Sequence, residues 1–153
     1  MTRVGLVALA CLLTILASGC GGSHKSSPAP SDQAEVRQVL ESYLHAQAQG
    51  DGSTACGLLS TAGQNQLIGL VMSAGKGLIT SRPSCEDAVG LVSAVAGAQL
   101  MSALDHARVE QIKISGPTAT AQVVDGTAFK PQQVKFQKSN GKWEITGVPT
   151  LGA

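Results

Sequence analysis

Three features of this 153-residue sequence have the residue types for acid–base chemistry. Asp105 and His106 are adjacent, and a carboxylate beside an imidazole could exchange protons with a substrate. Neighbouring residues at a helix end usually point apart, so this pair is a weak catalytic candidate. Tyr43 could offer a phenol to a pocket, but its spacing relative to apolar neighbours favours a core position. His45 falls on the polar side of the same segment, which favours a solvated imidazole.

Trp143 could stack on a ligand, but it alternates with Ile145 and is therefore expected to anchor the core. The sequence contains no G-x-S-x-G, HExxH, Walker or dinucleotide-binding motif, and Gly75-Lys76-Gly77 lacks the spacing of a phosphate-binding loop. We therefore assign no catalytic residue and no cofactor. Tyr43 and Trp143 are the candidate pocket residues.

Cys20 directly follows a segment that has the pattern of a secretory signal. Arg3 precedes an apolar run from Val4 to Ala17, and Ser18 and Gly19 come directly before the cysteine. A basic start, an apolar core too short for a permanent membrane helix and small residues at the end are typical of such signals. We expect residues 1–19 to be a signal peptide.

The four residues Ala17-Ser18-Gly19-Cys20 resemble the lipobox of bacterial lipoproteins. The resemblance implies that the thiol is diacylated before cleavage, so that the chain begins at a lipidated Cys20. It also implies a protein anchored at the extracytoplasmic face of the bacterial cell membrane. An ordinary secretory cleavage near Cys20 and a retained membrane helix are the alternatives.

The two remaining cysteines are Cys56 and Cys85, because Cys11 lies in the signal and Cys20 is expected to be acylated. An even number of thiols in an oxidising compartment favours a disulfide. This bond would add about 3–4 kcal/mol to the free energy of unfolding. Free buried thiols are an alternative. Two thiolates without a nearby His or third Cys cannot complete a zinc site, and a redox role would want a Cys-x-x-Cys motif. We predict a disulfide and no metal.

The charge balance argues against nucleic acid as a partner. Arg3 is the only charged residue before Cys20, so the remaining chain carries ten Lys and Arg and ten Asp and Glu side chains. A neutral chain with only four aromatic residues offers neither a basic field nor stacking platforms. Membrane attachment would therefore depend on the acyl chains rather than on a polybasic segment.

The remaining sequence divides into a tether and one domain. Residues 20–33 comprise the predicted lipidated cysteine and a stretch rich in Gly, Ser and Pro that has no large apolar side chain. Residues 34–150 are long enough for a single domain with its own core.

The first half of this domain has the spacing of helices. We expect a helix that Asp32 caps and Gly50 ends, a short helix near residues 55–59, a helix that opens with a Thr61–Gln64 capping box, and a core helix from Ser84 to about residue 104. The disulfide would join the second helix to the fourth.

In the second half of the domain, apolar and polar residues alternate with a period of two, which predicts strands. The expected strands contain residues 112–114, 119–123, 134–136 and 143–146, with turns at Gly116-Pro117, Asp125-Gly126 and Asn140-Gly141. Helices followed by an antiparallel meander indicate an α+β fold.

Several short motifs in this order resemble the nuclear transport factor 2-like (cystatin-like) superfamily, and in particular its small bacterial lipoproteins. They are Tyr43-Leu44-x-Ala46, Gly50-Asp51, Ala55-Cys56-x-Leu58-Leu59, Ser84-Cys85-Glu86-Asp87-Ala88 and the Asn-Gly-Lys-Trp-Glu-Ile of residues 140–145. The resemblance covers about residues 34–148. It implies a curved antiparallel sheet that wraps a long helix into a cone, whose mouth can hold a small apolar ligand.

The expected function is a membrane-anchored, non-enzymatic module that binds a protein partner or a small apolar ligand. The alternative is an isomerase-like or cyclase-like enzyme that acts on a small apolar substrate in the cone, with Tyr43 and an unidentified carboxylate. A surface protein without a ligand is a third reading. Sheet faces in this superfamily often dimerise, so a homodimer is compatible with the sequence.

Overall fold

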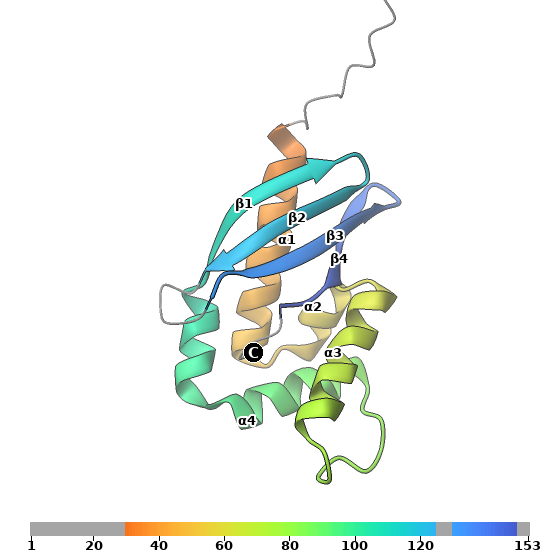
Figure 1. The fold of residues 1–153 in the computed structure, drawn as a ribbon, viewed down its shortest axis with the longest axis vertical. Coiled ribbons are helices and arrows are strands. Elements are labelled where there is room, and N and C mark those ends of the chain that lie inside the picture. The colour runs from red at the N-terminus through yellow and green to blue at the C-terminus, as the bar shows by residue number, and fades with distance from the viewer. Residues whose placement is uncertain (1–29, 125–129, 150–153) are drawn as a thin grey trace, which may run out of the picture.

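The computed structural model describes residues 30–124 and 130–149, which form four helices followed by four strands (Figure 1). The helices are α1 (Pro30–Gln49), α2 (Gly52–Gly57), α3 (Thr61–Ala74) and α4 (Cys85–Asp105). The strands are β1 (Arg108–Ser115), β2 (Thr118–Val124), β3 (Gln132–Ser139) and β4 (Lys142–Gly147). This order confirms the predicted α+β class. The predicted signal peptide, Cys20 and the Asp125-Gly126 turn lie outside the described residues.

Helix α1 begins earlier than predicted. It starts at Pro30, so residues 30–33, which we assigned to the tether, are helical. The prediction that Asp32 caps this helix is wrong, because Asp32 lies within its first turn. The carboxylate instead accepts hydrogen bonds from Lys138 Nζ and Trp143 Nε1 on the last hairpin. Gly50 follows the helix with a φ of 71°, as expected for a helix-ending glycine.

The caps of the next helices agree only in part with the predictions. Ser60, not Thr61, caps α3, with its Oγ accepting from the Gly63 amide at 3.2 Å. The predicted Thr61–Gln64 capping box is wrong, because Gln64 Nε2 donates to the Cys56 carbonyl at 3.0 Å. Ser84 caps α4 as predicted, and Asp87 completes a capping box with it.

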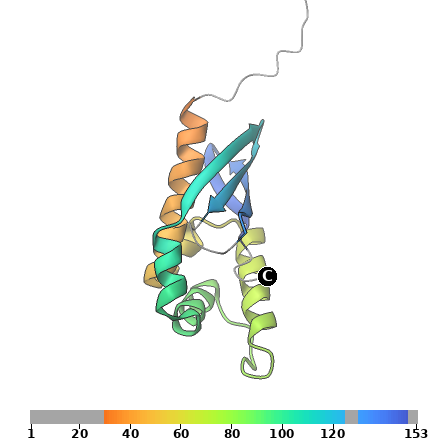
Figure 2. The ribbon, with the colours of Figure 1, turned by 60° about the vertical axis from the view of Figure 1, so that its left-hand side comes forward.

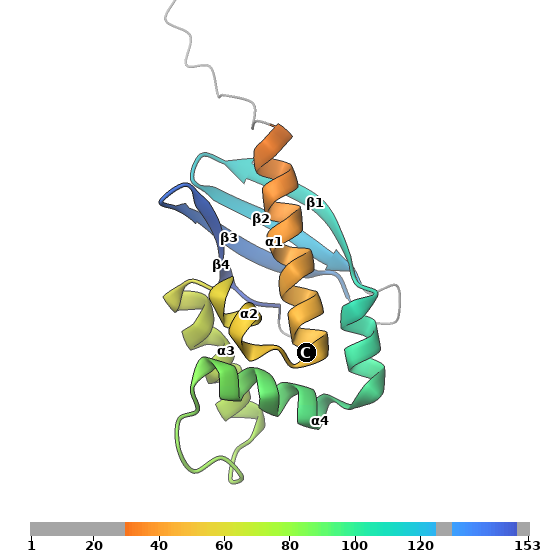
Figure 3. The ribbon, with the colours of Figure 1, turned by 180° about the vertical axis from the view of Figure 1, so that it is seen from behind.

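Helix α4 is bent and largely exposed. Gly97 has a φ of 71° and a ψ of 164°, a conformation open only to glycine, and the ribbon turns sharply there (Figures 1 and 3). Ala88, Val89 and Leu104 are its only buried residues, so the predicted core helix is buried only near its two ends. By length and composition α4 is the one described helix that could cross a membrane. The bend divides it into pieces no longer than about 18 Å, short of the roughly 30 Å hydrocarbon core.

The four strands form one antiparallel sheet in the order β1-β2-β3-β4, which confirms the predicted meander. Asn140 and Gly141 have φ values of 51° and 78°, the left-handed conformations that a two-residue hairpin turn requires. Figures 2 and 3 show that α1 lies across one face of the curved sheet, while none of the described helices covers the other face. Gln111, with a φ of 49°, lies at a bulge in β1 between Glu110 and Lys113.

The core lies between α1 and the covered face of the sheet. Its largest fully buried side chains come from α1, α4, β3 and β4: Phe136, Leu40, Ile145, Val36, Val89 and Val134. The helical layer is joined to the edge strand β4 by backbone hydrogen bonds, from the Ser60 amide to the Ile145 carbonyl and from the Ile145 amide to the Leu58 carbonyl, both 3.0 Å. Gly63 permits this approach, because a Cβ there would lie 2.4 Å from the Ile145 carbonyl oxygen.

The predicted disulfide is confirmed. Cys56 in α2 and Cys85 at the start of α4 are bonded, with their Cα atoms 6.1 Å apart. The bond closes a loop of the chain that contains all of α3, so both ends of that segment are fixed to one point of the fold.

Candidate functional site

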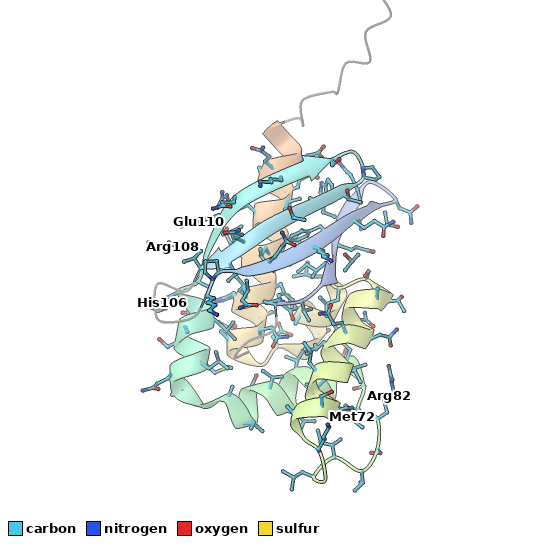
Figure 4. The ribbon with its side chains drawn as sticks, viewed as in Figure 1. Met72, Arg82, His106, Arg108 and Glu110 are labelled. Atoms are coloured by element: carbon cyan, nitrogen blue, oxygen red, sulfur yellow. A yellow bond between two sulfur atoms is a disulfide. The ribbon has the colours of Figure 1, made fainter. Side chains whose placement is uncertain are left out.

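The described surface carries a groove at the junction of three elements, which we call the α1–β1 groove. It has a volume of about 510 Å³ and lies between α1, the end of α4 and the beginning of β1. Figure 4 shows His106, Arg108 and Glu110 following one another along this junction. The lining residues are Arg37, Glu41, Leu44, His45, Leu104, Asp105, Ala107, Arg108, Val109 and Glu110.

The groove combines an apolar floor with a charged rim. Leu44, Leu104 and Val109 are all buried, so the floor is part of the core surface. The rim contains two arginines, two glutamates, an aspartate and a histidine. Because the rim carries both positive and negative side chains, it suits a ligand that carries both charges or many hydrogen-bonding groups.

His45 and Asp105 are joined across the groove, although 60 residues separate them in the chain. His45 Nδ1 lies 2.9 Å from Asp105 Oδ1, and His45 Nε2 lies 2.8 Å from Gln49 Nε2. An imidazole that donates from Nδ1 to the carboxylate and accepts at Nε2 from the amide satisfies both contacts. The two side chains are 60% and 45% exposed, so water reaches this pair freely.

Sequence reasoning missed this contact. It placed His45 correctly on the polar side of α1, but nothing in the local spacing indicated that the end of α4 would reach it. The expectation that Asp105 and His106 point apart is also wrong, since His106 Nδ1 lies 3.7 Å from Asp105 Oδ2. The only available signal was that both histidines and the aspartate stand near helix ends.

The two arginines of the groove differ in how they are held. Arg37 Nη1 donates to the Val109 carbonyl at 2.5 Å and lies 3.9 Å from Glu41 Oε1. The side chains of Arg108 and Glu110 form no hydrogen bond or ion pair with any described residue. Arg37 therefore fixes the wall of the groove, whereas Arg108 and Glu110 are available to a ligand.

A second groove of about 530 Å³ runs between α1 and the β3–β4 hairpin, with Trp143 in its wall. Trp143 is only 4% exposed, as expected for a core anchor, and Lys138 Nζ lies 5.5 Å from the centre of its ring. The hydrogen bonds from Lys138 and then Trp143 lower the pKa of Asp32, and the bond to Asp32 raises the pKa of Lys138. Asp32, Lys138 and Trp143 satisfy one another and form a structural junction beside this groove, which only Trp143 of the three lines.

Tyr43 lines neither groove. It is 3% exposed, and its hydroxyl accepts a hydrogen bond from the buried Gln47 amide at 2.9 Å. Burial raises the pKa of the phenol well above its ordinary value. The phenol is thus a satisfied core group, as its spacing predicted.

The described residues contain no group of three His, Cys, Asp or Glu side chains that could hold a metal ion. No family model, curated protein or solved structure matches the chain. The geometry of the α1–β1 groove is accordingly the main guide to a proposed function.

Proposed function

We propose that this protein is a lipid-anchored, extracytoplasmic binding module with a nuclear transport factor 2-like domain, and that its α1–β1 groove holds a polar partner. The observation that carries the proposal is the groove itself, with an apolar floor and the uncommitted side chains of Arg108 and Glu110 on its rim. A curved sheet packed on one long helix supports the fold assignment.

The proposed location is supported by the sequence and by one structural feature. The lipobox-like residues before Cys20 are the export and lipidation signal. The Cys56–Cys85 bond fits the oxidising environment outside the cytoplasmic membrane.

The groove favours a protein segment over a small apolar ligand. It is open to solvent and its rim is charged, whereas pockets for apolar small molecules are enclosed and mainly apolar. The space between α1 and the sheet is occupied by large side chains such as Phe136 and Leu40. A partner segment with one acidic and one basic side chain would pair with Arg108 and Glu110 while covering the floor.

The alternative of an isomerase or cyclase draws less support. Tyr43 is buried and accepts a hydrogen bond from Gln47, and no carboxylate among the described residues hydrogen-bonds to it. The His45–Asp105 pair has the arrangement of a base and its orienting group, which is the observation in favour of proton transfer. Its exposure leaves it without the dry surroundings that would tune such chemistry.

The lipid anchor is tested by replacing its acceptor. Cys20→Ala should move the protein out of the membrane fraction or leave it as an uncleaved, unlipidated precursor, because the acyl chains are the proposed attachment. Intact mass spectrometry of the membrane-extracted wild type should show the added diacylglyceryl group. A wild type without this added mass contradicts the anchor.

The binding role is tested by photo-crosslinking in the native membrane. A photoreactive amino acid at Glu41, on the groove rim, should give a discrete adduct, and Arg108→Glu should reduce it about tenfold through the loss of one charge-assisted bond. Lys113→Glu makes the same charge reversal on β1 outside the groove and should leave the adduct unchanged. Equal losses with both variants, or no adduct at Glu41, would contradict a groove-bound partner.

A further inference from the structure

The end of the molecule opposite the start of α1 exposes large apolar side chains. Leu78, in the α3–α4 loop, is 89% exposed, and in α4 Val95 is 83% and Leu91 36% exposed. These three are the exposed large hydrophobic residues of the described chain. Figures 1 and 2 place the loop and the first part of α4 together at this end. We call the surface formed by Leu78, Leu91 and Val95 the apolar end.

Helix α4 does not have the composition of an ordinary solvent-facing helix. Residues 88–104 carry no charged side chain, yet the middle of the helix is exposed. An exposed helix of a soluble domain normally presents charged residues to water. Leu91 and Val95, four residues apart in α4, share one uncharged face of the helix, and an exposed apolar face of this kind marks an interaction site.

The charged side chains of the α3–α4 loop are positive. Between residues 52 and 85 the only charged side chains are Lys76 and Arg82, which flank Leu78. The next acidic residues along the chain, Glu86 and Asp87, lie in the first turn of α4, where Asp87 takes part in the Ser84 cap. Arg82 Nη2 donates to Asn65 Oδ1 at 2.7 Å, which holds its guanidinium on the protein surface beside the loop. An apolar tip between two cations complements an anionic phospholipid surface, where apolar groups enter the acyl boundary and cations meet the phosphates.

The proposed anchor leaves the apolar end within reach of the membrane. Residues 20–29 can span at most about 35 Å, and α1, with its 20 residues, is about 30 Å long. The domain can therefore lie along the bilayer with Cys20 inserted near one end and Leu78 near the other. Because the anchor already holds the domain at the surface, even a weak second contact would be occupied.

We propose that the apolar end is a second membrane contact, which docks the domain on anionic phospholipid through Leu78, Leu91 and Val95 with Lys76 and Arg82 at its edge. This inference rests on the proposed lipid anchor, which supplies the first contact. Together they would hold the domain lying along the membrane rather than upright on its tether.

The test uses the full chain, purified with its native processing and incorporated into vesicles. Leu78→Trp places an indole at the apolar end, and Gln133→Trp places one on the exposed face of the sheet as a matched control. Vesicles contain brominated phosphatidylcholine with or without phosphatidylglycerol. We expect quenching of the Leu78→Trp indole on the anionic vesicles and none for Gln133→Trp, with the buried Trp143 as a constant background.

A charge variant gives the size of the effect. Lys76→Ser with Arg82→Ser, made in the Leu78→Trp chain, should lower the ratio of docked to free protein about thirtyfold, whereas Lys113→Ser with Lys135→Ser removes the same charge elsewhere and should not change it. No quenching of Leu78→Trp, or equal quenching at residue 133, would overturn the proposal. A dimer in solution that Leu78→Ser converts to a monomer would assign the apolar end to a second copy instead.

A flotation experiment distinguishes a failure of the anchor from a failure of the docking. Flotation on vesicles of phosphatidylcholine alone reports the acyl chains, so a chain that fails to float there lacks the lipid. A chain that floats there but shows no quenching of Leu78→Trp on anionic vesicles keeps the anchor and overturns the docking alone. The two failures are therefore distinguishable.

Discussion

Asp32 is the residue that joins the start of α1 to the last hairpin. Its Oδ1 accepts from Lys138 Nζ, and from Trp143 Nε1 at 3.3 Å. The same lysine lies 3.8 Å from Glu35 Oε2 and over the face of the indole. The residues leading to the predicted anchor therefore enter the fold at a point fixed to β3 and β4.

This junction predicts a pH-dependent stability. Hydrogen bonds from Lys138 and Trp143 lower the pKa of Asp32 in the folded protein. The stabilisation is present above the unfolded pKa of about 3.9 and is lost as the pH falls through the lower folded pKa. Asp32→Asn should therefore lower the thermal midpoint by a few degrees at neutral pH, and the difference from wild type should shrink as the medium becomes strongly acidic.

Thermal melts of both proteins across this acidic range measure the effect. Glu110→Gln removes a carboxylate without a hydrogen-bond partner among the described residues and serves as the control. It should leave the midpoint nearly unchanged at every pH. If Asp32→Asn lowers the thermal midpoint by the same amount at every pH, the carboxylate charge does not contribute to stability.

At the scale of elements, the disulfide organises the helical half. It joins α2 to the start of α4, where Ser84 Oγ caps α4 by accepting a hydrogen bond from the Asp87 amide. Helix α3 and the α3–α4 loop lie between the two cysteines, so the loop that carries Leu78 is held at both ends. This constraint fixes both ends of the segment that carries Leu78, whereas Leu91 and Val95 follow Cys85 in α4.

Cys56→Ser should destabilise the protein by about 3–4 kcal/mol, the chain-entropy value for closing a loop of this length. The sequence separation of the two cysteines is 29 residues. The corresponding drop in thermal midpoint is about 10–15 °C. Differential scanning calorimetry of Cys56→Ser, Cys85→Ser and the double variant should give one common value. An unchanged midpoint on reduction of the wild type would mean that the bond carries no stability.

The elements were more predictable from sequence than the contacts between them. The strands and the Asn140-Gly141 turn follow from local period and turn chemistry, and α4 begins at its predicted Ser84 cap. The partner of Asp32 could not be read locally, because Lys138 lies 106 residues away. The same applies to the His45–Asp105 contact, which depends on the bend at Gly97 that brings the end of α4 back toward α1.

At the scale of the whole molecule, α1 connects the two halves. One side of α1 packs against α4 and α2, and another packs against β1 and β4. Leu40 and Val36, both fully buried in α1, belong to the same core as Phe136 and Ile145 of the sheet. A single continuous core shared in this way predicts that the helices and the sheet unfold together rather than as separate units.

Two probes can test this cooperativity, because they report on different halves. Trp143, the only tryptophan, reports on the sheet, while circular dichroism in the far ultraviolet is dominated by the helices. Their denaturant transitions should coincide. Leu40→Ala should lower the free energy of unfolding by about 2–5 kcal/mol and shift both transitions equally, whereas Leu78→Ala, at a position 89% exposed, should shift neither. A tryptophan transition that precedes the helical one would show instead that the sheet is a separate folding unit and that α1 belongs energetically to the helices alone.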